Sequence, residues 1–250
     1  MASHAQAQIQ VNRRNRAPSP GTVVQLVVLC GLLILSAVPI VMMISMSLRP
    51  TTQIYTNFFA WPWPLYFNNY TSALAKLIAP LLRTLLVYAL SIVVMLSLAA
   101  GASYAFARIR FPGRAKLFYL IILVMMIPGT ILLTPHFILA NQLGLRDNLL
   151  GLVIFYVAGG QPFAIFLLSS YFQSQPAEMF ESARIDGASE LRALRSIAIP
   201  LAWPIIITLA VLNFTAIYND LIWPMLMLVS PSNQTLILAL QGYTRAVEST

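Results

Sequence analysis

The chain has 250 residues, of which 59% are apolar and only 9% are charged. A soluble globular domain carries about 25% charged residues, so 15 basic and 7 acidic side chains are too few for the surface of a soluble protein of this length. This composition excludes a soluble enzyme, a disordered chain and a fibrous protein, and it predicts an all-α, polytopic transmembrane helical bundle.

Five segments are long and apolar enough to cross a membrane, since a helix needs about 20 apolar residues to pass through the hydrocarbon core. We expect residues 1–20 to form a polar N-terminal tail and residues 21–250 to form the membrane domain. The first apolar segment is too long for the core of a cleaved signal peptide, so we expect it to be retained as a span. The five expected spans cover residues 22–46, 81–107, 117–139, 149–172 and 199–229.

The basic residues predict that the N-terminus is cytoplasmic, because positively charged loops tend to stay on the inner side of a membrane. This bias explains the net charge of +8 without nucleic-acid binding. The C-terminus is then outside, since the number of spans is odd. With this orientation the basic residues inside are Arg13, Arg14, Arg16, Arg108, Arg110, Arg114, Lys116, Arg184, Arg192 and Arg195, and those outside are Arg49, Lys76, Arg83, Arg146 and Arg245.

Prolines lie inside four of the five expected spans, where they remove a backbone hydrogen bond and can kink a helix. They are either ordinary features of membrane helices, tolerated where neighbours bind the freed carbonyl groups, or hinges around a moving pathway. These prolines are Pro39, Pro128, Pro162, Pro204 and Pro224.

The segment 173–198 is too long for a tight turn between two spans, and it is expected to be a cytoplasmic loop. Pro176 suits the first turn of a helix, and Gly187 suits a left-handed break, so the pattern predicts two short amphipathic helices joined at a glycine. The segment also holds four of the seven acidic residues of the chain, Glu178, Glu181, Asp186 and Glu190.

Both short helices are expected to carry an apolar face that must be buried. In the first helix, Met179, Phe180 and Ala183 can share such a face. Two interpretations stay open at this point: the face lies against the membrane or the chain's own spans, or it occupies a groove of a cytoplasmic partner.

A few polar residues fall inside the expected spans, where they need partners. Asp220, beside Asn219, either lines a pathway or forms a fixed pair with an arginine such as Arg83. Gln161 and Asn213, near mid-membrane, are either pathway residues that could bind sugar hydroxyls or partners in helix–helix hydrogen bonds.

The sequence shows no Ser/His/Asp set, no paired-carboxylate site and no metal-ligand spacing, so we expect no catalytic centre and no metal site. His136 lies near the outer end of the third span and is expected to be an interface residue rather than a metal ligand. Cys30 is the single cysteine, which excludes a disulfide within the chain.

Residues 181–188, E-S-A-R-I-D-G-A, followed by I-A-I-P at 197–200, resemble the EAA signature of ABC-importer permeases. That signature reads E-A-A, a glycine three residues later, and I-x-L-P about ten residues further on. This chain differs from it at Ser182 and Ile199.

Other strings are similar to the carbohydrate-uptake branch of these permeases, in particular to the second permease subunits of maltose and glycerol-3-phosphate type. The resemblance runs from about residue 22 to the end of the chain. It is carried by A-R-I-R-F-P-G-R at 107–114, M-I-P at 126–128, G-L at 144–145 and Y-N-D-L-I-W-P at 218–224.

The resemblance implies the permease fold of type I ABC importers and import of a sugar, oligosaccharide or related polyol phosphate across the bacterial inner membrane. It also implies a heterodimer with a second permease, two ATP-binding subunits and an extracytoplasmic solute-binding protein. The loop 173–198 would be the coupling helix seated in a cleft of the ATPase, with its carboxylates facing basic groups there. The contact residues would be Glu181, Ala183, Asp186, Gly187 and Ala188.

The chain contains no Walker string G-x-x-x-x-G-K-[ST]. The resemblance therefore implies a non-catalytic subunit without a cofactor, whose partner ATPase uses ATP and Mg²⁺.

Family members usually carry a sixth span, so we expect that span to be missing by truncation. The alternatives are a stand-alone secondary transporter or channel, for which Asp220 is the sole candidate for ion coupling, or a structural or enzymatic membrane subunit. The sequence does not identify the substrate.

Overall fold

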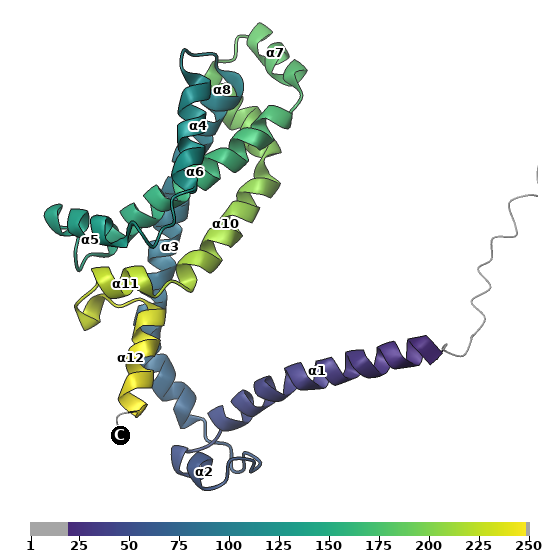
Figure 1. Ribbon diagram of the computed structural model, residues 1–250, viewed down its shortest axis with the longest axis vertical. Coiled ribbons are helices and arrows are strands. Elements are labelled where there is room, and N and C mark those ends of the chain that lie inside the picture. The colour runs from purple at the N-terminus through teal and green to yellow at the C-terminus, as the bar shows by residue number, and fades with distance from the viewer. Residues whose placement is uncertain (1–19, 249–250) are drawn as a thin grey trace, which may run out of the picture. The chain divides into compact units, whose positions relative to one another are not determined.

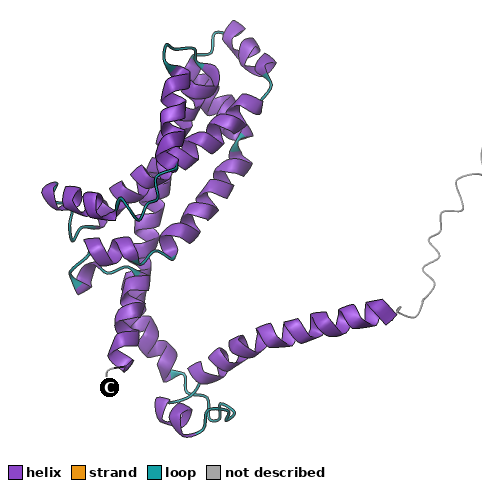
Figure 2. Ribbon diagram, in the orientation of Figure 1, coloured by secondary structure: helices purple, strands orange, loops and turns teal. Residues whose placement is uncertain are grey.

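The computed structural model describes residues 20–248. Within this range all regular structure is helical, as Figure 2 shows, which confirms the expected all-α class. The expected N-terminal tail, residues 1–20, lies outside the described residues except for Pro20. The chain divides into two compact units, residues 1–75 and 76–250, which are described separately.

The first unit contains the first expected span. Helix α1 runs from Pro20 to Ser47 and carries no charged residue, so its whole surface suits a lipid environment. After Pro50, the short helix α2 covers Thr51–Thr56, and the long helix α3, Asn68–Arg108, begins within the same unit (Figure 1).

The second unit is built on three helices. Helix α3 continues through it and packs with α6, Leu149–Ser174, and α10, Trp203–Tyr218. The buried core between them is made of Met95, Tyr104, Phe106, Ala164, Leu168, Phe172 and Leu209.

These three helices lie close to one another at Gly160 on α6. A Cβ atom at this position would lie 2.4 Å from Sδ of Met95 on α3 and 3.3 Å from Oδ1 of Asn213 on α10. Next to it, Gln161 donates a hydrogen bond from Nε2 to the carbonyl oxygen of Met95 over 3.1 Å. Tyr88 of α3 donates to the carbonyl oxygen of Ala210 on α10 over 3.1 Å. A larger residue at position 160 would therefore have to displace the side chain of Met95.

The third expected span, 117–139, is divided between two helices, α4 (Arg114–Met125) and α5 (Leu133–Gln142). The break follows from Pro128, which has no N–H to continue a helix and disfavours helical geometry at the residue before it. The residues between α4 and α5 form turns, in which the N–H of Ile131 bonds to the carbonyl oxygen of Pro128 over 3.1 Å.

The fifth expected span, 199–229, is interrupted twice. A turn of π-helix, Leu194–Ala198, leads into α9 (Ile199–Leu201), and the helical stretch 190–201 meets α10 at a bend of 73° next to Pro204. Helix α10 then ends at Tyr218, and α11 covers Ile222–Met227.

The remaining short elements connect or follow these helices. Helices α7 (Ala177–Ile185) and α8 (Glu190–Ala193) lie between α6 and α10. A 3₁₀ turn, Pro231–Asn233, and α12, Leu236–Glu248, follow α11.

Among residues 20–248, three helices are able to cross a membrane by length and composition, Gly21–Ser47, Asn68–Arg108 and Leu149–Ser174. They contain the first, second and fourth expected spans. A fourth candidate arises if the bent pair 190–201 and 203–218 forms one broken span. The fold is thus a helical membrane fold in which two of the expected spans are broken helices.

The close approach at Gly160 predicts a position-specific effect of side-chain size. Gly160→Val forces Met95 and Asn213 apart, and we expect it to destabilise the fold by about 1–3 kcal/mol. Thermal unfolding of the purified protein in detergent measures the change. Gly159→Val is the matched control, because a Cβ at Gly159 meets no atom within 4 Å. Adding Met95→Ala to the Gly160→Val variant should restore part of the stability, and equal unfolding temperatures for the two glycine variants would contradict the packing argument.

Candidate functional site

The loop between α6 and α10 begins with an extended linker. Helix α6 ends at Ser174, Gln175 takes extended backbone angles, and Pro176 stands at the N-cap of α7. The side chain of Gln175 is buried, and its Nε2 donates a hydrogen bond to the carbonyl oxygen of Ala198 over 3.1 Å. This bond ties the start of the loop to its end.

The break between the two short helices is a helix-ending motif centred on Gly187. This glycine has φ +77°, its N–H bonds to the carbonyl oxygen of Arg184 over 3.0 Å, and the N–H of Ala188 bonds to the carbonyl oxygen of Ala183 over 2.8 Å. The pair of bonds is a Schellman motif, which favours glycine at the left-handed position. The expected form of the loop, two short helices joined at Gly187, is confirmed.

Helix α8 starts immediately after this turn. The side-chain oxygen of Ser189 accepts a hydrogen bond from the N–H of Arg192 over 3.4 Å and caps the helix. The following residue, Glu190, lies in the first turn of α8, where the helix dipole favours a negative charge.

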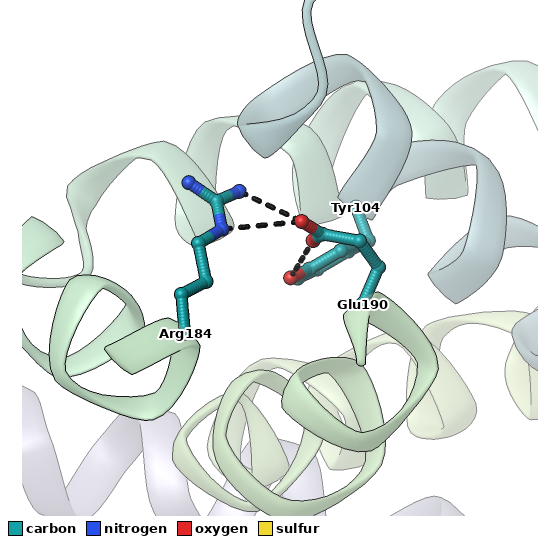
Figure 3. Close-up of polar contacts among 3 residues, drawn as sticks. All are labelled: Tyr104, Arg184 and Glu190. Carbon is teal, nitrogen blue, oxygen red and sulfur yellow. Dashed lines mark hydrogen bonds and ion pairs between the residues drawn. The ribbon is translucent and has the colours of Figure 1, made fainter. Parts of the chain in front are cut away.

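The carboxylate of Glu190 joins three helices, as Figure 3 shows. One oxygen accepts a hydrogen bond from the hydroxyl of Tyr104 on α3 over 2.8 Å, and the other is 2.9 Å from Nη2 of Arg184 on α7. Because the side chains of Arg184 and Glu190 are about half exposed, their ion pair is worth about 0–1 kcal/mol. The contact therefore fixes geometry more than it adds stability.

A second connection runs through Arg108, the last residue of α3. Its Nη2 donates hydrogen bonds of 2.6 Å to the carbonyl oxygens of Phe172 and Gln175 at the end of α6, where carbonyl groups lack helical partners. Its guanidinium carbon lies 4.1 Å from the ring centre of Phe180 on α7, a cation–π contact. Arg108 thus holds the ends of α3 and α6 together and supports α7.

Phe180 and Met179 face different environments. Phe180 is 3% exposed and packs in the core, whereas Met179 is 43% exposed. The apolar face expected for Met179, Phe180 and Ala183 is therefore only partly buried within this chain: Phe180 points toward Tyr104 and Arg108, whereas Met179 stays open to a further contact. Ile185, at the end of α7, is 87% exposed.

An open hollow of about 620 Å³ lies beside α7, next to the end of α3 and the start of α4. Four arginines and two glutamates line it, and one of these glutamates is paired with an arginine, so the hollow is electropositive. The charged lining residues are Arg108, Arg110, Arg114, Arg184, Glu181 and Glu190.

The five residues expected at a partner contact lie on α7 and the turn after it. Glu181, Asp186 and Gly187 are exposed, while Ala183 and Ala188 are partly exposed. The structure therefore brings these residues onto one short stretch that is open to solvent in this chain.

The four residues expected to line a pathway make contacts within the chain. Gln161 bonds to α3 as described, and Asn213 and Asn219 donate to carbonyl oxygens of their own helix, those of Leu209 over 2.9 Å and Thr215 over 2.8 Å. Gln161 and Asn213 flank the close approach at Gly160.

Asp220 has a structural partner different from the expected one. Its carboxylate accepts a hydrogen bond from the hydroxyl of Tyr156 on α6 over 2.8 Å and from the N–H groups of Ile222 and Trp223 over 3.0 and 3.4 Å. The suggested pair with Arg83 is wrong, because Nη1 of Arg83 donates to the carbonyl oxygen of Gln234 instead. Asp220 therefore ties the start of α11 to α6.

His136 lies in an aromatic cluster. Its ring centre is 5.5 Å from that of Phe155 and 5.6 Å from that of Trp223, and these two rings stack at 5.2 Å. Within residues 20–248, no group of three or more His, Cys, Asp and Glu side chains is placed to hold a metal ion.

Asp147 is a polar centre that the sequence reading missed. It has a left-handed backbone (φ +54°), and its carboxylate accepts bonds from the N–H of Val229, the N–H and hydroxyl of Ser230, and the amide of Asn233. The hydroxyl of Ser230 is the largest cause of a pKa lowered to about 2. Since these partners are about 80 residues away in sequence, no local pattern could have revealed them.

Residues 94–248 match the family described as "Binding-protein-dependent transport system inner membrane component". The chain is also similar to the solved structure of a bacterial ABC transporter involved in the import of the acidic polysaccharide alginate. That match has a TM-score of 0.80 and 25% identity, and it covers 95% of this chain and 88% of the other.

Three curated relatives illustrate the similarity in sequence. The diacetylchitobiose uptake system permease protein NgcG of Streptomyces coelicolor is 31% identical over 75% of this chain and 63% of the relative. The trehalose transport system permease protein SugB of Mycobacterium tuberculosis is 30% identical over 82% and 76%. The maltodextrin transport system permease protein MdxG of Bacillus subtilis is 35% identical over 72% and 60%. The chain thus matches less than two thirds of the length of NgcG and of MdxG.

The bonds of Asp147 predict a pH-dependent contribution to stability. Because its folded pKa is about 2, below the unfolded value of about 3.9, the ionised carboxylate stabilises the fold above that value. The contribution is lost as pH falls through about 2. We expect Asp147→Asn to lower the unfolding temperature in detergent at pH 7, and the difference from the unmodified chain to shrink as pH is lowered from about 4 toward 2. Asp186→Asn, at an exposed position, is the control, and a difference that does not change with pH would refute the charge argument.

Proposed function

We propose, since the chain belongs to the family of binding-protein-dependent transport system inner membrane components, that it is a permease subunit of an ATP-driven ABC importer for a sugar, oligosaccharide or related polyol phosphate. The relatives named above are permease proteins for diacetylchitobiose, trehalose and maltodextrin, all of them carbohydrates. The substrate class of this chain rests on that similarity.

The observation that carries this proposal is the loop between α6 and α10. Its inner side is fixed to α3 and α6 by Arg108 and Glu190 and by the burial of Phe180, whereas α7 and the turn at Gly187 stay exposed. A short exposed helix with a fixed base suits a groove in a partner protein. We infer that α7 is the coupling helix and occupies a cleft of an ATP-binding subunit.

The contact residues of this coupling helix would be Glu181, Ala183, Asp186, Gly187 and Ala188. Ile185, whose side chain is 87% exposed at the end of α7, adds an apolar group that a partner surface would bury. Burial of one such side chain is worth about 1.5–3 kcal/mol. The partner would hydrolyse ATP with Mg²⁺, and this chain would act as a non-catalytic subunit.

The contacts around α7 also suggest how a movement of the loop would be transmitted to the membrane helices. Closure of the ATP-binding subunits would displace α7, and the bond from Glu190 to Tyr104 would pass that displacement to α3. The bonds of Arg108 would pass it to the end of α6. Because α3, α6 and α10 meet at Gly160, the three helices would move as a group and alternately open the pathway to each side.

Gln161, Asn213, Asn219 and Asp220 remain the candidates for the pathway. The contacts of Gln161 and Asn213 at the meeting of three helices place amide groups where a shift of α6 against α10 would expose them. Amide groups are suitable hydrogen-bond partners for sugar hydroxyls.

The wider assembly follows from the same proposal. It consists of a second permease as heterodimer partner, two ATP-binding subunits and an extracytoplasmic solute-binding protein, in the bacterial inner membrane. The greater number of basic residues in the segments assigned to the inside supports a cytoplasmic N-terminus. The carboxylate of Asp220 is engaged with Tyr156 and the start of α11, which argues against its use for ion coupling in a stand-alone secondary transporter.

The coupling proposal predicts loss of the ATPase contact when the exposed turn is changed. Glu181→Lys reverses a charge on α7, and Gly187→Val strains a left-handed backbone position. We expect about tenfold less ATP-binding subunit to co-purify with either variant, with the permease inserted normally. Gly159→Ala, where an added Cβ meets nothing, is the control. Undiminished co-purification and uptake in both variants would overturn the proposal.

The route through Glu190 predicts a different defect. Tyr104→Phe removes only the hydroxyl that donates to Glu190, so the ATP-binding subunits should still bind while sugar uptake per ATP hydrolysed falls several-fold. Reconstituted complexes measure both quantities in one preparation. Tyr119→Phe is the matched control, since Tyr119 is 65% exposed on α4. An unchanged ratio of uptake to hydrolysis would exclude this route.

A further inference from the structure

The segment that follows α1 is folded around a buried arginine. Arg49 is 0% exposed, and it is the only charged residue between positions 48 and 75. Its Nη1 donates to the carbonyl oxygen of Phe58 over 2.9 Å, its Nη2 donates to those of Gln53 and Asn57, and its Nε donates to Oε1 of Gln53 over 3.3 Å. The guanidinium thus binds carbonyl groups in and just after α2, at the C-terminal end of the helix, where the helix dipole favours a positive charge.

The same segment is bonded back to the end of α1. The amide of Asn69 donates to the carbonyl oxygens of Ser47 and Arg49 over 2.9 and 2.8 Å, and the N–H of Tyr66 donates to that of Leu48 over 2.9 Å. The hydroxyls of Ser47 and Tyr70 lie 2.6 Å apart. Residues 48–70 therefore form a closed structure on the end of α1, visible around α2 in Figure 1, which we call the Arg49 cap.

The outer surface of the Arg49 cap is aromatic and carries no charge. Four of its aromatic side chains are between 74% and 83% exposed, those of Tyr55, Phe59, Trp61 and Trp63. Large exposed aromatic side chains gathered on one short uncharged segment are unfavourable in water and mark a contact site. Arg49, the only charged residue of the segment, is buried among carbonyl groups. The exposed surface of the cap therefore offers no charge to a charged partner.

The chemistry of the Arg49 cap fits the level of the lipid headgroups. Tryptophan and tyrosine, with an apolar ring and a polar group, are enriched at that level of a bilayer. A position of the Arg49 cap within the hydrocarbon core is excluded. Residues 57–67 are largely irregular, and their backbone N–H and C=O groups would lack partners there. The cap also continues directly from α1, a helix long enough to cross a bilayer, so a spanning α1 would bring the cap to the headgroups.

We propose that the Arg49 cap is an interfacial anchor, in which buried Arg49 holds residues 48–70 so that their aromatic side chains enter the lipid headgroup region at the end of α1. The proposal is independent of ATP-driven transport, since it requires only that α1 spans the membrane. Arg49 acts in it as a positioning residue.

Depth-dependent fluorescence quenching tests the anchor. The full chain with Trp203→Phe and Trp223→Phe keeps Trp61 and Trp63 as its only tryptophans. In vesicles of phosphatidylethanolamine and phosphatidylglycerol, we expect lipids brominated near the headgroup to quench the two indoles about twofold more strongly than lipids brominated near the chain end. Quenching by neither lipid would place the cap in water or against protein, and stronger quenching by the deep bromines would place it in hydrocarbon. Both results overturn the proposal.

Replacement of the arginine tests its positioning role. We expect Arg49→Leu to remove the depth preference and Arg49→Lys to retain part of it, because an ammonium group cannot reach all the acceptors that the planar guanidinium reaches. Arg195→Leu, which removes an exposed arginine elsewhere, should leave the quenching unchanged. An unaltered depth preference in Arg49→Leu would show that the arginine does not hold the cap, even where the wild-type quenching supports an anchor.

Discussion

The structure depends on one constraint of the membrane, namely that backbone N–H and C=O groups need partners wherever a helix ends or breaks. In this chain side chains supply those partners. Arg49 binds the carbonyl groups at the end of α2, Arg108 binds those at the end of α6, and Asp220 binds the N–H groups at the start of α11. Asp147 does the same for the N–H groups of residues 229 and 230. Each of these four charged side chains therefore has a structural role within the chain.

This constraint explains which parts of the fold the sequence could predict. Composition and span length identify a helical membrane protein, and the glycine at position 187 together with Pro176 predicts the two short helices of the loop, because these are local patterns. The partners of Asp220 and Asp147 lie 64 and about 80 residues away. A local sequence pattern carries no information about contacts over such separations. The predicted pair of Asp220 with Arg83 was therefore wrong, and the hydrogen bonds of Asp147 were not predicted.

The breaks in the third and fifth expected spans show a second limit of sequence reading. The hydropathy of a segment predicts whether it prefers a lipid environment, but it does not predict whether the segment forms one continuous helix. Pro128 divides α4 from α5, and the bend beside Pro204 separates α9 from α10. Both prolines were visible in the sequence as either ordinary residues or hinges, and the structure shows that each lies at an interruption.

The contacts that hold the loop between α6 and α10 differ in strength, and under the proposed coupling role the difference determines how that loop would move. The half-exposed pair of Arg184 and Glu190 is worth about 0–1 kcal/mol, whereas burial of the Phe180 side chain contributes about 1.5–3 kcal/mol. A force on the exposed side of α7 would therefore rearrange the ion pair first, while Phe180 stays packed against Arg108 and Tyr104. Helix α7 would then pivot about Phe180 rather than detach, and the bonds from Arg108 to the end of α6 would carry the rotation into the membrane helices.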